Sequence, residues 1–351
     1  MRTFIFYIFM AAALAAPQQA KALTIEEAVG LALKNNHAIK RTAFEYDSAR
    51  HGVGEARAGF LPSLTASYTY AESSEDAYGG QNGSSVGTIT AAYNVFRGFR
   101  DTNSEREARA RATAARYQAR SMRAEVALAA RRRYTEVLRA EGALKTATEG
   151  VDLLERQKSD AELFYREGLI ARNELLKVAV ELAIARQNLL EAKGGHTIAL
   201  RSLEKTIGTE IPEGEELVPL TMEPESMMEM DTEAMEKELL ENRSELKYLR
   251  QSREAYDHAA SVAGGAMLPS VDLSVSYYKY GDSPAIGGRD NSYDSATVSM
   301  ITASWTLFDG MRSYNSRSRL RFMGRAAWER LKGTLVGSVI GLPLALVFYY
   351  C

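Results

Sequence analysis

The sequence predicts a mixed fold in which β-hairpins of membrane-crossing length are joined to long antiparallel coiled-coil helices. Three observations predict it. Leu-Pro-Ser occurs twice, at 61–63 and 268–270, and the copies are 207 residues apart. Each copy is followed by two strands with alternating apolar and polar residues. A proline-free stretch rich in Ala, Arg, Glu and Leu begins near Arg100. A long internal duplication of helices and hairpins indicates a pseudo-symmetric building block rather than an enzyme pocket.

The start of the chain has the features of a secretory signal peptide, which we place at residues 1–22. Arg2 precedes an apolar run over residues 4–16, and Ala20-Lys21-Ala22 is a small-x-small cleavage site. The run is shorter than the roughly 20 residues that span a bilayer, which argues against an uncleaved transmembrane helix. Cys351 is the only cysteine, so we expect packing or oligomerisation, not an intrachain disulfide, to hold the exported chain together.

Composition and motifs exclude several classes of function. The formal net charge is −2, which gives a nucleic-acid partner no electrostatic support. The four histidines, at positions 37, 51, 196 and 258, are scattered, and none has a second ligand at metal-binding spacing. The sequence contains neither a Gly-rich phosphate loop nor a nucleophile elbow. We therefore expect no catalytic site, no cofactor and no metal site, and the chain is not expected to be an enzyme.

A pair of helices is expected before each β-hairpin. Pro62 and Pro269 end the second helix of each pair, because proline cannot continue a helix and disfavours helical backbone in the residue before it. The two copies match in Glu27-Ala28-Val29 and Glu233-Ala234-Met235. The expected helices are Leu23–Asn36 and Ile39–Gly59 in the first copy, and Thr232–Asn242 and Leu246–Ala266 in the second.

Four segments alternate with period 2, the pattern of strands that have one apolar and one polar face. They form two predicted hairpins, 63–96 and 271–308, with polar loops at 73–85 and 281–294. The apolar sets are Leu64, Ala66, Tyr68, Tyr70; Ile89, Ala91, Tyr93, Val95; Val271, Leu273, Val275, Tyr277; and Ile301, Ala303, Trp305, Leu307. In the last segment the apolar parity changes near Met300, which predicts a β-bulge there.

The strands are about ten residues long, which is the length of a tilted strand that crosses an outer membrane. Aromatic residues near strand ends suit the interfacial girdle of a barrel. The expected girdle residues are Tyr70, Tyr93, Phe96, Tyr277, Trp305 and Phe308. A soluble β-sandwich has the same alternation, and the strands alone favour it somewhat. In lipid, four strands cannot close a barrel and open edges are not tolerated, so several chains would have to contribute.

The stretch Arg100–Glu167 predicts a helix on the order of 100 Å long, and a second helix is expected from Arg172. Heptad spacing pairs them in an antiparallel coiled-coil hairpin over 100–207, with a tip at 166–171. The seam rows are Ala130, Val137, Leu144, Val151 and Ala140, Ala147, Leu154, Ala161 in the first helix, and Leu175, Leu182, Leu189 and Val178, Ala185, Ala192, Ala199 in the second. A soluble helical hairpin explains the heptads, but not the direct fusion of such helices to membrane-length strands, twice.

This organisation resembles the TolC family of outer-membrane export ducts. The resemblance rests on the order and spacing of several motifs over residues 23–312. These are Leu23-Thr24-Ile25-Glu26-Glu27-Ala28, Ala32-Leu33-Lys34-Asn35-Asn36, the two Leu-Pro-Ser segments, the Phe-x-Gly turns at 96–98 and 308–310, and Tyr165-Arg166-Glu167-Gly168-Leu169. His37 stands where the family usually has proline, which affects only a helix start.

The resemblance implies a homotrimer in the cell outer membrane. Three chains would close one 12-stranded barrel, continued by an α-helical tunnel through the periplasm. Such a duct is passive and needs no cofactor. A periplasmic adaptor protein would dock on the helical tips, with Gly168, Leu169 and Ile170 facing it. An inner-membrane pump, or the ABC exporter of a type I secretion system, would supply the energy.

The second copy departs from this pattern. After a linker at 208–231, residues 232–320 repeat the helix pair, the hairpin and the start of a long helix, but the heptads do not develop. Residues 321–351 form an atypical apolar tail, for which a C-terminal membrane anchor is a poor alternative. We expect a truncated or frame-shifted product whose export function is impaired.

Two other functions are compatible with parts of the sequence. A periplasmic adaptor (membrane fusion protein) also has a long coiled-coil hairpin, but compact lipoyl-like half-motifs flank it there instead of membrane-length strands. A purely structural coiled-coil protein of the envelope would not need the two β-hairpins. The export duct is therefore the favoured hypothesis.

Overall fold

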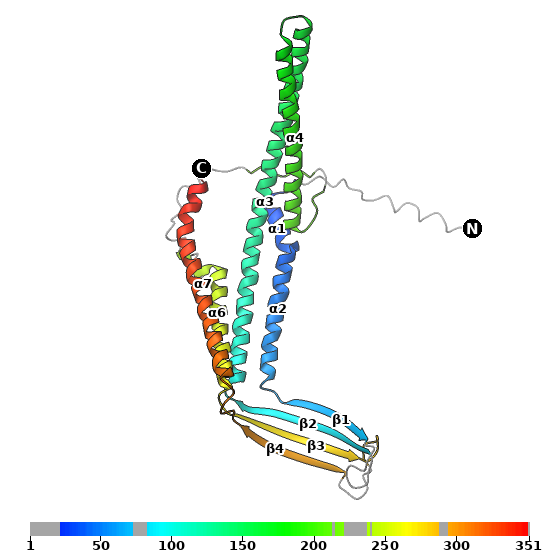
Figure 1. The fold of residues 1–351 in the computed structure, drawn as a ribbon, viewed down its shortest axis with the longest axis vertical. Helices are drawn as coiled ribbons and strands as arrows, with labels where there is room; N and C mark the ends of the chain where they lie inside the picture. The colour runs from blue at the N-terminus through cyan, green and yellow to red at the C-terminus, as the bar shows by residue number, and fades with distance from the viewer. Residues whose placement is uncertain are drawn as a thin grey trace, which may run out of the picture. The chain divides into compact units, whose positions relative to one another are not determined.

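The computed structural model describes residues 22–72, 83–212, 215–220, 237–238, 241–287 and 294–349 (Figure 1). Nearly all of the expected signal peptide, most of the predicted helix Thr232–Asn242 and much of both hairpin loops lie outside the described residues. The elements are α1 (Ile25–Asn35), α2 (His37–Ala58), β1 (Ser63–Glu72), β2 (Gly83–Arg97), α3 (Arg100–Arg166), α4 (Arg172–Ile207), α6 (Ser244–Gly265), β3 (Ser270–Gly281), β4 (Ser295–Ser304) and α7 (Arg312–Tyr349).

The chain divides into two compact units. The first consists of Met1–Lys40 and Met122–Glu229, and the second of Arg41–Ser121 and Met230–Cys351. The first unit holds α1, α4 and most of α3, and the second holds the β-sheet, α6 and α7.

The core of the first unit forms around α1, which begins with a complete capping box. The Thr24 hydroxyl accepts a hydrogen bond from the Glu27 backbone N–H, and the Glu27 carboxylate accepts one from the Thr24 N–H, both at 3.1 Å. Small residues on α1 allow close packing against α3 and α4. The core residues are Leu23, Ala28, Ala32, Ile39, Val126, Ala130, Tyr134, Val137, Leu203, Ile207 and Leu217.

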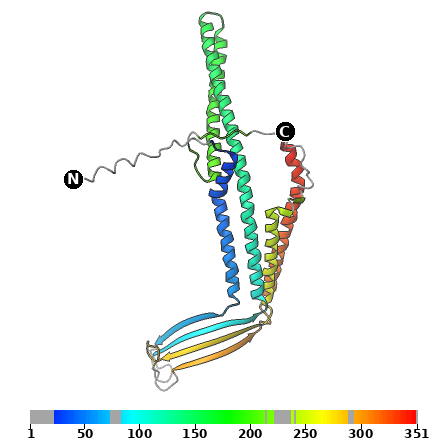
Figure 2. The same ribbon diagram turned by 180° about the vertical axis from the view of Figure 1, so that it is seen from behind.

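α3 and α4 lie side by side and antiparallel in both views, and join at the predicted tip (Figures 1 and 2). An ion pair crosses between them from Glu155 to Arg186, at 2.8 Å, and the His196 imidazole lies 3.7 Å from the Glu141 carboxylate. Every residue of the predicted seam rows is buried or half-buried. The heptad prediction is therefore confirmed residue by residue.

The second unit contains one antiparallel sheet with strand order β1-β2-β3-β4 (Figure 1). The register puts Leu64 opposite Ala91 and Ala91 opposite Val275, and Leu273 opposite Ile301, so these members of the predicted apolar sets share one face. Of the other members, Val95 is skipped by the register, and Trp305 and Leu307 lie beyond the end of β4. The bulge predicted near Met300 is wrong, because β3 and β4 pair in continuous register from Ser270–Ser304 to Lys279–Ser295. The register instead shifts in β2 between Asn94 and Phe96.

α6 and α7 pack antiparallel in the second unit, and small residues bring them close. A Cβ on Gly324 would lie 3.4 Å from the Tyr256 Cβ, and Arg253 lies over the Trp328 ring at 4.7 Å from its centroid. α7 continues through residue 321, where the atypical apolar tail was expected to begin, and Ala327 is buried. Within the described part of the chain, no helix combines the length and the apolar character needed to cross a membrane.

The same turn follows β2 and β4. Gly98 and Phe99 have φ of +60° and +62°, and Gly310 and Met311 have φ of +68° and +64°. Two consecutive left-handed residues are uncommon, since the second of each pair carries a side chain. Their recurrence before α3 and α7 shows that the sequence duplication is also a duplication of backbone conformation.

Candidate functional site

One face of the sheet is apolar and exposed. Rows across the strands place Ala66, Ile89 and Tyr277 together, and Tyr93, Leu273 and Ile301 together. Ile301 has 74% of its surface exposed, and Leu64 has 76%. An apolar face of this size on strands of 10 to 15 residues suits contact with lipid better than contact with water.

The opposite face is rich in hydroxyl groups. Thr65, Thr90 and Ser276 form one row, and the Thr90 Oγ1 and Ser276 Oγ atoms are hydrogen-bonded at 2.9 Å. β4 is an exception, since its continuous register places Val298 and Met300 on this polar face. The arrangement matches a strand with one lipid-facing side and one water-facing side.

Both edges of the sheet are open. β1 pairs only with β2, and β4 pairs only with β3, so in the described chain each has one row of backbone N–H and C=O groups without a strand partner. In a hydrocarbon environment such groups cost several kcal/mol each, on the order of the cost of an unmade hydrogen bond. In such an environment the sheet would be complete only when another strand covers each edge.

The predicted girdle residues divide into two groups. Four of them lie on the apolar face of the paired strands: Tyr70, Tyr93, Phe96 and Tyr277. Trp305 and Phe308 follow the end of β4 and lie outside it, although the predicted hairpin ran to 308. The Trp305 indole N–H donates to the Met267 carbonyl at 3.0 Å, and Phe308 is 77% exposed. These two residues have no strand partner in a single chain because β3 begins at Ser270, opposite Ser304.

The tip of the α3–α4 hairpin is a Schellman cap. Gly168 has φ of +72°, and the Leu169 N–H donates to the Phe164 carbonyl at 2.8 Å. The Gly168 N–H donates to the Tyr165 carbonyl at 3.0 Å, which completes the motif. Leu169 is 70% exposed, Phe164 and Tyr165 are also exposed, and Ile170 is half-buried. The tip therefore presents an apolar surface held by backbone hydrogen bonds.

Tyr134 is a structural residue that the sequence did not single out. Its side chain is fully buried, and its hydroxyl lies 2.7 Å from the Leu23 carbonyl oxygen and 2.8 Å from the Val218 carbonyl oxygen. Leu23 and Leu217 form a parallel β-bridge beside it. Burial raises the pKa of the Tyr134 phenol, so it stays protonated and can donate. Tyr134 thus fixes the start of the expected mature chain and part of the expected linker to α3.

Two further polar contacts fix helix positions, one in each unit. In the first, the Asn36 side-chain amide donates to the Thr206 carbonyl at 2.8 Å, and its oxygen accepts from the Ala38 N–H at 2.8 Å. In the second, the Glu105 carboxylate binds Arg57 at 2.7 Å and Arg109 at 2.6 Å. The hydrogen bonds from Arg57 and then Arg109 hold the pKa of Glu105 below its ordinary value.

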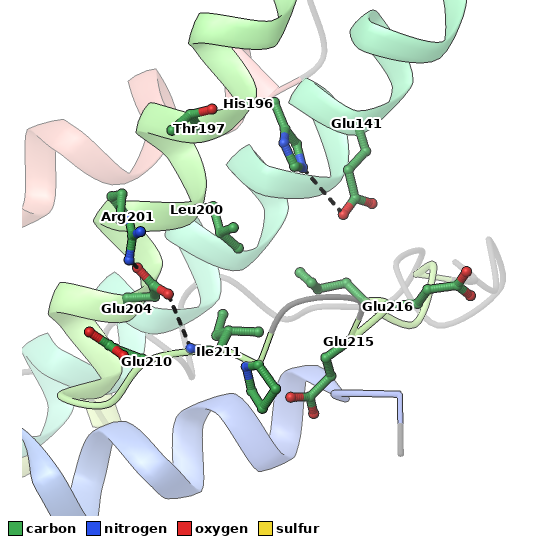
Figure 3. A pocket seen from close by; sticks show the side chains of 12 residues that line it. Glu141, His196, Thr197, Leu200, Arg201, Glu204, Glu210, Ile211, Glu215 and Glu216 are labelled. Carbon is green, nitrogen blue, oxygen red and sulfur yellow. Dashed lines mark hydrogen bonds and ion pairs between the residues drawn. The ribbon is translucent and has the colours of Figure 1, made fainter. Parts of the chain in front are cut away.

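An acidic hollow lies in the first unit between α3, α4 and residues 210–217 (Figure 3). Its most buried carboxylate, that of Glu204, accepts hydrogen bonds from the Ile211 N–H at 3.1 Å and from Arg201 at 2.8 Å. Glu204 is therefore used to hold the 210–217 segment against α4. Over the described ranges, no group of three or more His, Cys, Asp or Glu residues has the geometry of a metal site.

Comparison with known proteins identifies the fold. The family model for the outer membrane efflux protein matches residues 28–209, just over half of the chain. The chain belongs to this family. The match confirms the family that the motifs predicted, and the family description agrees with the predicted location in the outer membrane.

Known relatives of this outer membrane efflux protein are distant in sequence and close in fold. Protein CyaE of Bordetella pertussis is 25% identical over 265 residues, which are 73% of this chain and 55% of CyaE. The chain thus spans about half the length of that curated relative. The CmeC outer membrane channel of Campylobacter jejuni superposes with a TM-score of 0.76 at 15% identity, over 90% of this chain and 68% of CmeC.

VceC, an outer membrane protein of Vibrio cholerae, superposes with a TM-score of 0.74 at 16% identity, over 93% of this chain and 79% of VceC. At such identities the likeness establishes the fold. It confirms the predicted combination of long antiparallel helices and β-hairpins, and it agrees poorly with a periplasmic adaptor or a purely helical envelope protein.

Proposed function

We propose that the chain is the outer-membrane channel component of a tripartite efflux pump or a type I secretion system. It would act as a passive export duct and not as an enzyme. The observation that carries the proposal is the sheet, which has an apolar face, a hydroxyl-rich face and two open edges. Only closure into a ring removes those edges in lipid.

We further propose that three copies supply twelve strands, with the apolar face toward lipid and the Thr/Ser face toward a water-filled lumen. Family membership and the TolC-like order of motifs support this number. Four strands per copy are too few for one chain to close, and membrane barrels of this kind have at least about eight strands.

The helical hairpin would form part of the periplasmic tunnel, and its tip would meet a periplasmic adaptor that links the duct to an inner-membrane pump or ABC exporter. The exposed apolar surface at Leu169 supports the tip as a docking point, because its Schellman cap holds the backbone in one conformation. We expect Leu169→Asp to abolish adaptor cross-linking while trimers still form, since the tip lies outside the sheet. Loss of trimers in this variant would instead indicate a structural role.

The two faces of β2 provide the test of the channel. Ile89 lies on the apolar face and its neighbour Thr88 on the polar face. A lysine facing lipid near the bilayer midplane costs about 2–4 kcal/mol. Ile89→Lys should therefore strongly reduce heat-modifiable trimers in isolated outer membranes. Thr88→Lys should preserve trimers and change the conductance measured in a planar bilayer.

The unmodified chain and the two lysine variants are compared at equal expression. Equal tolerance of both lysines would contradict the assignment of the faces. Recovery of the unmodified chain as a monomer that needs no detergent would contradict the channel itself.

A further inference from the structure

Two fixed offsets relate the halves of the sheet and its flanking helices. α2 ends at Ala58 and α6 ends at Gly265, 207 residues later. α3 begins at Arg100 and α7 begins at Arg312, 212 residues later. The first offset relates β1 to β3, and the second relates β2 to β4. The left-handed turns before α3 and α7 obey the second offset as well.

β2 is the second strand of the first hairpin, and β3 is the first strand of the second hairpin. The seam between them therefore joins a second strand to a first strand. In this seam Thr90 lies opposite Ser276, with their hydroxyls hydrogen-bonded at 2.9 Å, and Ile89 lies opposite Tyr277. The open edges of the sheet are again a second strand, β4, and a first strand, β1. One observed junction thus supplies a template for the junction that the single chain lacks.

We propose that β4 of one copy pairs with β1 of a neighbouring copy in the register that β2 and β3 use within the chain. Applied to the observed pairs, the offsets place Thr302 opposite Thr69 and Ile301 opposite Tyr70. This inference rests on the proposed ring of copies and goes beyond it, because it fixes which residues meet.

The residues at the open edges support this register. In the proposed junction, Thr302 and Thr69 occupy the positions that Thr90 and Ser276 have in the template, and both pairs carry hydroxyls. The Ile89–Tyr277 pair becomes Ile301 and Tyr70, with the same residue types. A one-residue slip would move every side chain of one strand to the other face and would not reproduce these stabilising cross-strand pairs.

The register also accounts for the early end of β4. β2 continues through its bulge to Arg97, opposite Ser270, whereas β4 stops at Ser304. By the same offsets, pairing with a neighbour would extend β4 to Asp309, opposite Ser63, with Leu307 in the bulge position. Phe308, now 77% exposed, would then pair with Leu64 in the ladder, and Leu307, now 79% exposed, would be the inserted residue of the bulge.

Engineered cysteines test the register in the full chain with Cys351→Ser. Thr69→Cys/Thr302→Cys should convert most of the protein to disulfide-linked species of two and three chains on non-reducing gels. The pair cannot close within one chain, because three strand spacings, about 14 Å, separate β1 from β4. Thr90→Cys/Ser276→Cys is the positive control, since the template pair should close within one chain.

Ser67→Cys/Thr302→Cys is the matched control, because Ser67 lies on the same face as Thr69, two residues along β1. The offset takes the Cα atoms beyond about 7 Å, so we expect roughly tenfold less cross-linking. If trimers form but the Thr69/Thr302 pair does not exceed this control, the register is overturned and the ring stands. If the Cys351→Ser background forms no trimers, both the ring and the register are overturned.

Discussion

Replacement of Tyr134 by phenylalanine tests whether one hydroxyl fixes the 215–220 segment to the helical hairpin. The ring would keep its fully buried position, and only the hydroxyl would be lost. That hydroxyl contacts two carbonyl oxygens, at 2.7 and 2.8 Å. Removing it leaves these acceptors without their buried donor, which costs about 1–3 kcal/mol.

Hydrogen exchange measures this cost locally. The Val218 amide reports on the anchor, because its N–H donates to the Leu23 carbonyl at 3.1 Å. If opening of this bridge controls its exchange, 1–3 kcal/mol corresponds to roughly 5- to 150-fold faster exchange. Amides in the α3–α4 seam should change much less, since the seam does not depend on the bridge.

Tyr165→Phe is the matched control, because Tyr165 lies on the same helix with 41% of its surface exposed. It should leave exchange at Val218 unchanged. Unchanged protection of the Val218 amide in Tyr134→Phe would refute the reasoning, and would show that apolar packing of Leu23 and Leu217 alone holds the segment.

Four further substitutions have defined outcomes. Gly98→Ala and Gly310→Ala both place a side chain at positive φ, which destabilises the fold by about 1 kcal/mol each. Only the Cβ of Gly98→Ala also collides with the Gly265 carbonyl. Gly98→Ala should therefore lower the melting temperature of the trimer far more than Gly310→Ala does. Glu105 has a lowered pKa in the folded chain, so its ion pairs stabilise above the unfolded pKa of about 4.3 and are lost as pH falls through the folded value. Melting temperatures between pH 6 and 3 should therefore fall more steeply in the wild type than in Glu105→Gln, and parallel curves would contradict this. Asn36→Ala removes a bond to the end of α4 and a turn bond, which should destabilise the first unit by about 1–2 kcal/mol in exchange measurements.

Local patterns predicted most of the fold. Heptad rows such as Ala130 and Val137 became buried seam positions, because a helical stripe needs no knowledge of distant residues. The tip at Gly168 was predictable for the same reason, since a glycine that follows a helix favours the left-handed cap. The presence of the strands, and the face on which each residue lies, followed from the alternation of apolar and polar residues with period 2.

Non-local contacts were not predictable from these patterns. Tyr134 owes its role to carbonyls 111 and 84 residues away in sequence, and no periodicity marks it. Likewise, the packing of Trp328 on α6 was hidden by the change of composition after residue 320. Arg253 over the indole ring and Gly324 at the helix contact hold this part of α7 to its neighbour.

The position of the bulge was nevertheless encoded in the sequence, at a place other than Met300. Tyr93 and Phe96 are three residues apart, and strict alternation would put them on opposite faces. The structure puts them on one face, opposite Leu273 and Val271, because the shift between Asn94 and Phe96 inserts one residue. Aromatic spacing is therefore a better signal here than a change of apolar parity.

The same spacing recurs in Trp305 and Phe308, where no bulge exists in the single chain because no strand pairs there. If both aromatics are to reach a common lipid-facing side, β4 needs the extra residue that β2 has, and only a strand across the open edge can impose it. In the proposed ring, the sequence of β4 would therefore specify a conformation that one chain cannot complete. Dependence on a neighbour would then explain why the predicted strand ends at 308 while β4 ends at Ser304 in the single chain.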